Sequence, residues 1–342
     1  MKKVILFTSI IVGAIVGVGF ISGKEVVTFF ARFGVIGLLF SVFAGVCFGV
    51  LIYYFSINNK NVSTLIYSKK PQNCVKTCEK WHQNNEKLQI SVIFQKVLLC
   101  VYVVISAVMI SGFRSLFLNF LPAIFVELVV FLILGCLIFL LQFKTGDIGK
   151  ITFSFLLVFL VIIVVLFFQN VKNFEFVYKK RVNTIYVFCL MSFYVSMNVF
   201  TSLPLILNAG KLLNKKQCKY VSFLIGITMT ILLMVCTILL FNKNGAMPIL
   251  DIIENKILYI IYVVLIVFGL LTTVYSSLQG CINLCKNGNT FKNRVLVIYF
   301  SYIFSSFGFS VLVEKVYPLL GFITMLALIV IYLSIDKNRK IA

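Results

Sequence analysis

The segment from Val12 to Glu25 carries the residue types whose spacing suggests chemistry inside a membrane. It reads VGAIVGVGFISGKE, with four glycines within eleven residues, followed by a lysine and a glutamate. The surrounding apolar run begins at Val4, so both charges fall where the chain is expected to lie within the bilayer. Irregular backbone is tolerated at that depth where it lines a cavity, and ionisable side chains there are costly. We therefore predict a membrane helix that breaks near Gly17–Gly19 and turns freed backbone groups toward a binding site.

This break is a predicted binding place for a carboxylate. A half-helix over about 20–31 would present free N–H groups and the positive end of its dipole, which together bind anions. The substrate-binding residues predicted here are Gly17, Val18, Gly19 and Phe20. Alternatively, the glycines at 13, 17, 19 and 23 form small-x3-small patterns, which let two helices pack closely without any ligand.

Glu25 is the second chemical group of this segment. Its carboxylate could bind a substrate amine, carry a proton or line an external vestibule. Alternatively, it simply reaches water, or it pairs with Lys24 or with Arg32, which is seven residues further on and therefore on the same helix face. We include Glu25 among the predicted substrate-binding residues and leave these roles open.

Two later segments carry polar residues within apolar runs. Tyr194, Ser196 and Asn198 precede Pro204, which lacks a backbone donor, and we predict a second helix break with these three side chains at the substrate site. Gly269, Thr272 and Thr273 are spaced i, i+3, i+4, so one carbonyl and two hydroxyls share a helix face. Such oxygens suit Na⁺, although Ser and Thr in helices often bond only their own backbone.

The composition indicates a polytopic membrane protein. Of 342 residues, 61% are hydrophobic and 12% are charged, and the mean hydropathy is +1.08, which no soluble core requires. The net charge of +21 is spread in short runs between apolar segments, so we expect a lipid bilayer and no nucleic acid as partner. A single histidine and the lack of a phosphate-binding glycine loop argue against an enzyme and against ATP-driven transport. Cys74, Cys78 and His82 lack an evident fourth metal ligand.

Ten segments are long enough to span a bilayer, which takes about 20 apolar residues. They cover about 4–31, 35–57, 89–113, 116–143, 148–169, 184–207, 218–241, 257–281, 295–312 and 316–335, and a polar loop fills 58–88. Twenty of the 31 Lys and Arg residues lie on the side of the two termini, and nine lie on the opposite side. The positive-inside rule therefore predicts cytoplasmic termini and a cytoplasmic 58–88 loop.

A polar connection at 170–183 divides this single transmembrane domain into residues 1–170 and 183–338, with five segments in each part. Because five is odd, two similar halves must have opposite orientations in the membrane. Inverted repeats of this kind are a transporter architecture whose binding site is formed by broken helices. The fold class predicted is an all-α five-plus-five inverted repeat in which the first and sixth helices are discontinuous.

The opening of the chain also resembles a known family. Residues Val12–Glu25, followed by Phe29-Phe30 and Phe33-Gly34, are similar to the start of the bacterial YkvI membrane-protein family, which usually has Gln where this chain has Lys24. That family looks like a branch of the amino acid–polyamine–organocation superfamily, which has the LeuT-type fold. The resemblance implies a sodium site between the first and eighth helices. Its ligands here would be the carbonyls of Gly13 and Val16 with Gly269, Thr272 and Thr273.

Together these observations predict a multi-pass secondary transporter of the bacterial cytoplasmic membrane. It would carry a small organic solute, an amino acid or a related compound, by alternating access coupled to Na⁺ or H⁺, and would hold no other cofactor. The alternative is a receptor subunit of the same fold, like a germinant receptor, that binds a small molecule without transporting it. The residues name neither the solute nor a protein partner.

Overall fold

The computed structural model describes residues 2–66, 78–140, 148–170, 182–284 and 290–341, and these are helical with no strand among them. Six of the described helices are long and apolar enough to cross a membrane: Val35–Ile57, Val92–Phe117, Thr184–Leu212, Lys215–Leu239, Lys256–Tyr275 and Phe309–Asp336. Four shorter apolar helices are Lys3–Ile15, Ala123–Cys136, Leu157–Asn170 and Val295–Ser305. The protein is therefore an all-α, membrane-embedded protein.

The first apolar segment is discontinuous, as predicted. It consists of α1 (Lys2–Ile15), α2 (Val18–Ile21), α3 (Lys24–Phe29) and a 3₁₀ turn, η1 (Ala31–Phe33). The chain leaves the helix at Val16-Gly17 and again at Ser22-Gly23. Gly23 has φ +83°, a left-handed conformation that residues with a Cβ rarely adopt. The predicted half-helix over 20–31 is wrong, because this second turn divides it.

Most of the remaining helices overlap the predicted segments, but the predicted segment 295–312 is interrupted after Ser305. The first part of the chain continues with α4 (Val35–Ile57), α5 (Asn59–Ile66), α6 (Cys78–Phe117), α7 (Ala123–Leu140) and α8 (Ile148–Asn170). The second part contains α9 (Thr184–Leu212), α10 (Lys215–Leu239), the 3₁₀ turn η4 (Leu250–Ile252), α11 (Lys256–Leu284) and α12 (Thr290–Ser305). It ends with α13 (Phe309–Val311), the π-helical η5 (Leu312–Val316) and α14 (Tyr317–Ile341).

Two features of the prediction are wrong. The region 58–88 is not simply a polar loop, because α5 occupies 59–66 and α6 already begins at Cys78. The sequence signal for α5 is the spacing of Val62, Leu65 and Ile66, which lie on one face and are buried.

The sixth segment is also not broken, because α9 runs unbroken from Thr184 to Leu212 with Pro204 inside it. The polar side chains there satisfy their own helix. The Asn198 amide donates to the Tyr194 carbonyl (2.9 Å), and Thr201 and Ser202 donate to the Asn198 carbonyl (3.0 and 2.7 Å). Polar residues in an apolar run therefore did not require an opening of the backbone.

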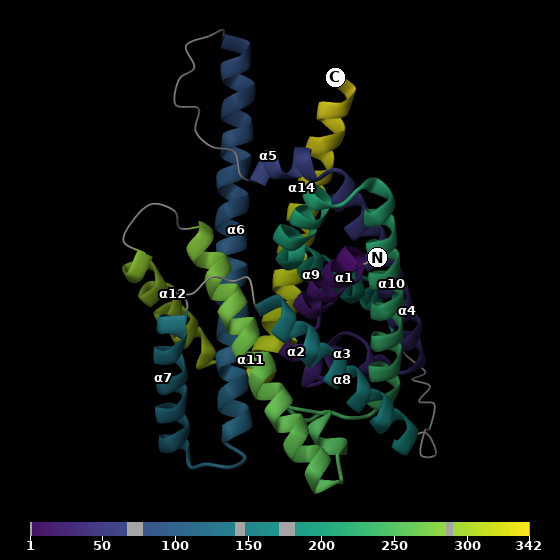
Figure 1. Ribbon diagram of the computed structural model, residues 1–342, viewed down its shortest axis with the longest axis vertical. Coiled ribbons are helices and arrows are strands. Elements are labelled where there is room, and N and C mark those ends of the chain that lie inside the picture. Colours follow the sequence, from purple (N-terminus) through teal and green to yellow (C-terminus); the bar gives the residue numbers. More distant parts are fainter. Residues whose placement is uncertain (1, 67–77, 141–147, 171–181, 285–289, 342) are drawn as a thin grey trace.

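Helices at corresponding places in the two parts of the chain pack against each other. The contacts pair α1 with α9, α4 with α10, and α6 with α11. Figure 1 shows α6 and α11 on one side of the molecule, α4 and α10 on the other, and the broken first segment between them. Glycines allow the α4–α10 crossing: a Cβ at Gly45 would lie 2.1 Å from the Thr230 hydroxyl, and one at Gly49 would lie 3.4 Å from Gly226 Cα.

The outward faces are apolar as well as the interior. On α4, Leu39, Phe43, Val46 and Val50 follow one helix face and are 66, 49, 52 and 62% exposed. The opposite face of the same helix buries Ala44, Phe48 and Ile52. A helix that is hydrophobic all round belongs in a lipid environment, so this arrangement supports the membrane assignment independently of helix length.

Candidate functional site

The carboxyl group of Glu25 lies at the centre of the candidate site. Glu25 is in α3, is only 4% exposed, and its Oε2 has no hydrogen-bond partner. A Cβ added at Gly19 would lie 2.0 Å from Glu25 Oε1, so the carboxyl group fills the space that glycine leaves open. Among the described residues no ion pair reaches Glu25. A buried carboxyl group without a partner is costly, and this is the chemical anomaly of the structure.

Tyr194 from α9 brings a second unsatisfied group to the same region. It is fully buried, its hydroxyl has no hydrogen-bond partner, and it lies within electrostatic reach of Glu25. The rings of Phe29 and Phe30 lie 5.2 and 5.3 Å from its ring, centroid to centroid, and that of Phe48 lies 6.0 Å away. The structure thus brings together two predicted site residues, Glu25 and Tyr194, from helices distant in sequence.

The other two predicted site residues of α9, Ser196 and Asn198, lie on different faces of the helix. Ser196 and Asn198 are both buried. Asn198 lies one turn from Tyr194 and uses its amide on the Tyr194 carbonyl. Ser196 is two residues from Tyr194, which places it about 200° around the helix and away from that face. The structure does not join Ser196 to Glu25.

The backbone at the first break is partly satisfied internally. The Gly17 carbonyl accepts hydrogen bonds from the N–H groups of Phe20 and Ile21, each at 3.0 Å. The Phe20 amide is therefore not free for a ligand, and its side chain is fully buried, with its ring 6.1 Å from that of Phe159. The side chain of Val18 lies outside the described parts of the chain, and its role stays a prediction.

Distant groups hold the second turn of this segment. The Tyr262 hydroxyl of α11 donates to the Ile21 carbonyl at 2.6 Å, and the Ile249 N–H donates to the Ser22 carbonyl at 3.2 Å. The Ser22 hydroxyl donates to the Gly19 carbonyl at 3.0 Å. The irregular backbone is therefore fixed by side chains and loops of the second half of the chain.

Neither predicted partner of Glu25 pairs with it. Lys24 is 3% exposed, and its Nζ lies 2.6 Å from Glu314 Oε1 in η5 and 3.3 Å from the Gly245 carbonyl. Arg32 donates to the Tyr186 hydroxyl at 3.5 Å and lies over the Phe33 ring. The two alternatives in which Glu25 serves as a structural ion-pair partner are wrong for this structure.

The predicted sodium ligands are only partly brought together. Thr272 and Thr273 both donate to the Gly269 carbonyl, at 3.0 and 2.8 Å, as the alternative of backbone bonding predicted. A Cβ at Gly17 would lie 4.0 Å from Thr273 Cγ2, so α11 does approach the break. Gly13 is half-buried and Val16 is buried. A sodium site formed by these residues stays a prediction.

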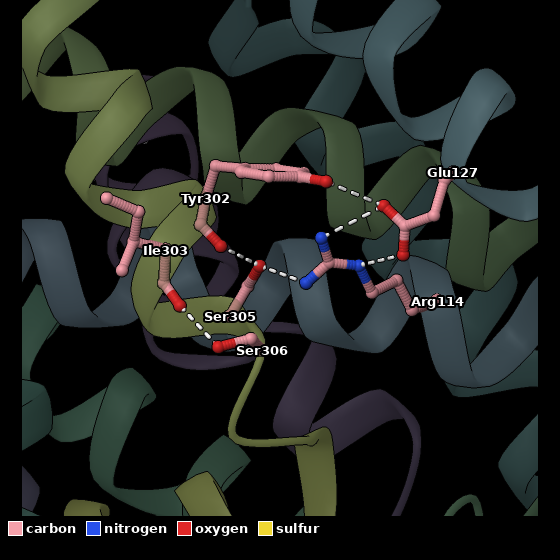
Figure 2. A network of polar contacts seen from close by, with 6 residues as sticks. All are labelled: Arg114, Glu127, Tyr302, Ile303, Ser305 and Ser306. Atoms are coloured by element: carbon pink, nitrogen blue, oxygen red, sulfur yellow. Dashed lines mark hydrogen bonds and ion pairs between the residues drawn. The ribbon is translucent and has the colours of Figure 1, made fainter.

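A second intramembrane carboxylate, Glu127, has a full set of partners (Figure 2). Its Oε1 lies 2.8 Å from Arg114 Nε, and its Oε2 accepts from Arg114 Nη2 at 3.1 Å and from the Tyr302 hydroxyl at 2.8 Å. The Arg114 guanidinium also bonds Ser305 and lies 4.6 Å from the Tyr302 ring centroid. The charges of Glu127 and Arg114 are thus balanced locally, which is the pattern of a structural cluster.

The position of Glu127 in the chain explains why Arg114 lies close to it. Glu127 lies in the second turn of α7, which begins at Ala123 directly after Pro122. Arg114 lies in the last turn of α6, only a short turn away. In the sequence, the signal for this pair is an acid and a base on either side of one predicted turn between helices.

The side chains of Cys74, Cys78 and His82 lie outside the described residues, so that constellation is not placed. Comparison of the chain with models of known protein families gives no match. Comparison with curated proteins gives no significant match either.

Proposed function

We propose that this protein is a secondary transporter that carries a small organic solute, an amino acid or a related compound, together with a proton. The observation that carries the proposal is the Glu25 carboxyl group, which is buried at a helix break and forms no ion pair with any described residue. A plain membrane anchor has no use for such a group, and its burial must be compensated by a proton or a ligand.

The contact between Glu25 and Gly19 suggests how proton and solute are coupled. The expected place for a solute carboxylate is the open side of the Gly17–Gly19 backbone, and Glu25 Oε1 lies against that same backbone. A charged Glu25 would repel an incoming carboxylate, whereas a protonated Glu25 could move aside and donate a hydrogen bond to it. Tyr194, whose hydroxyl is unpartnered, supplies a further donor nearby. Solute binding would then require a bound proton.

The same proposal includes the finer architecture. Ten membrane spans in a five-plus-five inverted repeat are supported by the packing of α1 on α9, α4 on α10 and α6 on α11, since each pair joins corresponding spans. The unbroken α9 departs from the usual two-break arrangement. On this basis, and on the opening residues, we propose a LeuT-type fold and membership of the YkvI family, with both termini in the cytoplasm of a bacterial cell.

Uptake by purified protein in liposomes tests the proposal. An imposed inward proton gradient should drive accumulation of at least one amino acid from a labelled panel, and a protonophore should abolish it. Replacing Na⁺ by choline should leave uptake unchanged. Saturable binding of the same compound without any gradient-driven uptake would instead favour the receptor alternative. Uptake that follows Na⁺ and ignores the proton gradient would contradict the role given to Glu25.

A further inference from the structure

A cavity remote from the broken segment lies where α4, α5, α9 and α10 meet. Its volume is about 330 Å³. It is lined by Ser56, Ile57, Asn58, Asn59, Lys60, Asn61, Gly210, Leu213, Lys215 and Cys218. Two lysines and three asparagines line it, and no acidic residue does. This composition contrasts with the apolar helix faces nearby and indicates a polar occupant that carries negative charge.

Two helices begin at this cavity. The first turn of α5 starts at Asn59, and that of α10 starts at Lys215. The first amides of an α-helix have no acceptor within the helix, and the positive end of the dipole lies there. α10 begins with a capping box formed by the side chains of Asn214 and Gln217, in which Gln217 accepts from the Asn214 N–H at 3.1 Å. The start of α5 therefore offers amides to an anion, and the start of α10 adds the positive end of its dipole.

Two helices also end near this cavity, and free carbonyl groups at their ends would repel an anion. Several of these carbonyls instead accept hydrogen bonds from asparagine side chains. Asn59 Nδ2 donates to the carbonyls of Ser56 in α4 and Gly210 in α9, each at 2.9 Å, and Asn58 Nδ2 donates to the Tyr54 carbonyl at 2.9 Å. These bonds use up nearby acceptors and tie the α4–α5 corner rigidly to α9, so the groups left for a ligand are mainly donors.

The Ser56 side chain lines this cavity. Ser56 is 3% exposed, and its hydroxyl makes no hydrogen bond to another described residue. A ligand oxygen in the cavity could accept a hydrogen bond from this hydroxyl.

From these features we infer that the cavity binds a phosphate group. Two ammonium groups, two helix starts and a serine hydroxyl match the several oxygens and the charge of a phosphate better than those of a single carboxylate. The phosphate could belong to an anionic lipid headgroup or to a free phosphate ion, because both offer the same chemistry. The proposal is independent of solute transport and of the residues at the helix break.

Titrations of the full-length protein separate the two sources. In neutral detergent at low ionic strength, inorganic phosphate is added and followed by calorimetry. In nanodiscs of neutral lipid, phosphatidic acid is added in small amounts and retention is followed by native mass spectrometry. Binding in the first experiment indicates free phosphate, and binding only in the second indicates a headgroup.

Variants then locate the site. Lys60→Gln with Lys215→Gln should weaken the observed binding at least about tenfold, since each charge-assisted contact is worth at least that factor. Ser56→Ala is a milder variant that preserves the fold and should weaken binding about threefold or more. Lys216→Gln, the next residue on α10 and not part of the cavity wall, is the matched control and should bind as the wild type does. The inference is overturned if the wild type binds neither probe, or if the double variant or Ser56→Ala binds as tightly as the control.

Discussion

Glu25 and Glu127 are two carboxylates in apolar helices of the same chain, and their surroundings differ in every respect. Glu127 has a guanidinium and a tyrosine hydroxyl around it and a side chain that is 42% exposed. Glu25 is 4% exposed, and no described residue forms a hydrogen bond with its Oε2. A carboxylate that the fold satisfies contributes to structure, whereas one that the fold leaves unsatisfied must take its partner from outside.

The neighbouring lysine sharpens this contrast. Lys24 is adjacent to Glu25 in sequence and equally buried, yet it is paired with Glu314 across the molecule. Successive residues of α3 point about 100° apart around the helix, so Lys24 and Glu25 meet different neighbours. Both side chains are buried, and the two differ in whether another described residue pairs with them.

The largest effect is expected for Glu25→Gln. Removing the titratable proton site should lower proton-driven uptake at least about a hundredfold, because several kcal/mol of coupling energy are lost. Stability should stay within about 1 kcal/mol, since no ion pair is broken. The measurements are liposome uptake and thermal unfolding. Glu127→Gln is the control and should transport normally; equal loss of uptake in both variants would remove the distinction between the two carboxylates.

Arg114→Met should have the next largest effect, on stability rather than transport. It leaves Glu127 without its cation, and because that carboxylate is partly exposed we expect a loss of about 2 kcal/mol rather than the full cost of a buried charge. The midpoint of thermal unfolding reports this loss. Adding Glu127→Leu should restore most of it. If the single variant kept its stability but lost uptake, the cluster would be functional.

Gly19→Leu should reduce solute affinity at least about tenfold while the protein stays folded. A Cβ at this position meets Glu25 Oε1 at 2.0 Å, and that flexible side chain can move, so the carboxyl group is displaced rather than the helix. Affinity and melting temperature are measured on the same purified variant. An unstable protein with intact affinity would instead show that the glycine serves close packing.

The smallest effect is expected for Thr272→Ala with Thr273→Ala. Both hydroxyls already donate to the Gly269 carbonyl, so their removal should cost less than about 1 kcal/mol and change proton-driven uptake less than about threefold. Thermal unfolding with and without Na⁺ is the second measurement. If Na⁺ stabilised the wild type but not this variant, the result would support a sodium site at these residues. It would also weaken the assignment of Glu25 as the coupling group.

The amino-acid sequence by itself determined the helical membrane character, the approximate places of most apolar helices and the break at Gly17, because apolar length and glycine spacing are local properties. It also singled out Glu25 and Tyr194, which the structure places in the same region. It did not determine that α9 stays continuous, since whether Asn198 and Ser202 open the helix or bond within it depends on their neighbours. Local pattern is therefore a weaker guide to breaks made by polar side chains than to those made by glycine.

Only the tertiary structure decided the partner of each charge. Glu25 had two plausible cations nearby in sequence, Lys24 and Arg32, and the fold sends both elsewhere. Glu127 instead meets Tyr302, which is 175 residues away. An ion pair depends on distances of a few ångströms between side chains, and those distances are set by how helices cross rather than by their order along the chain.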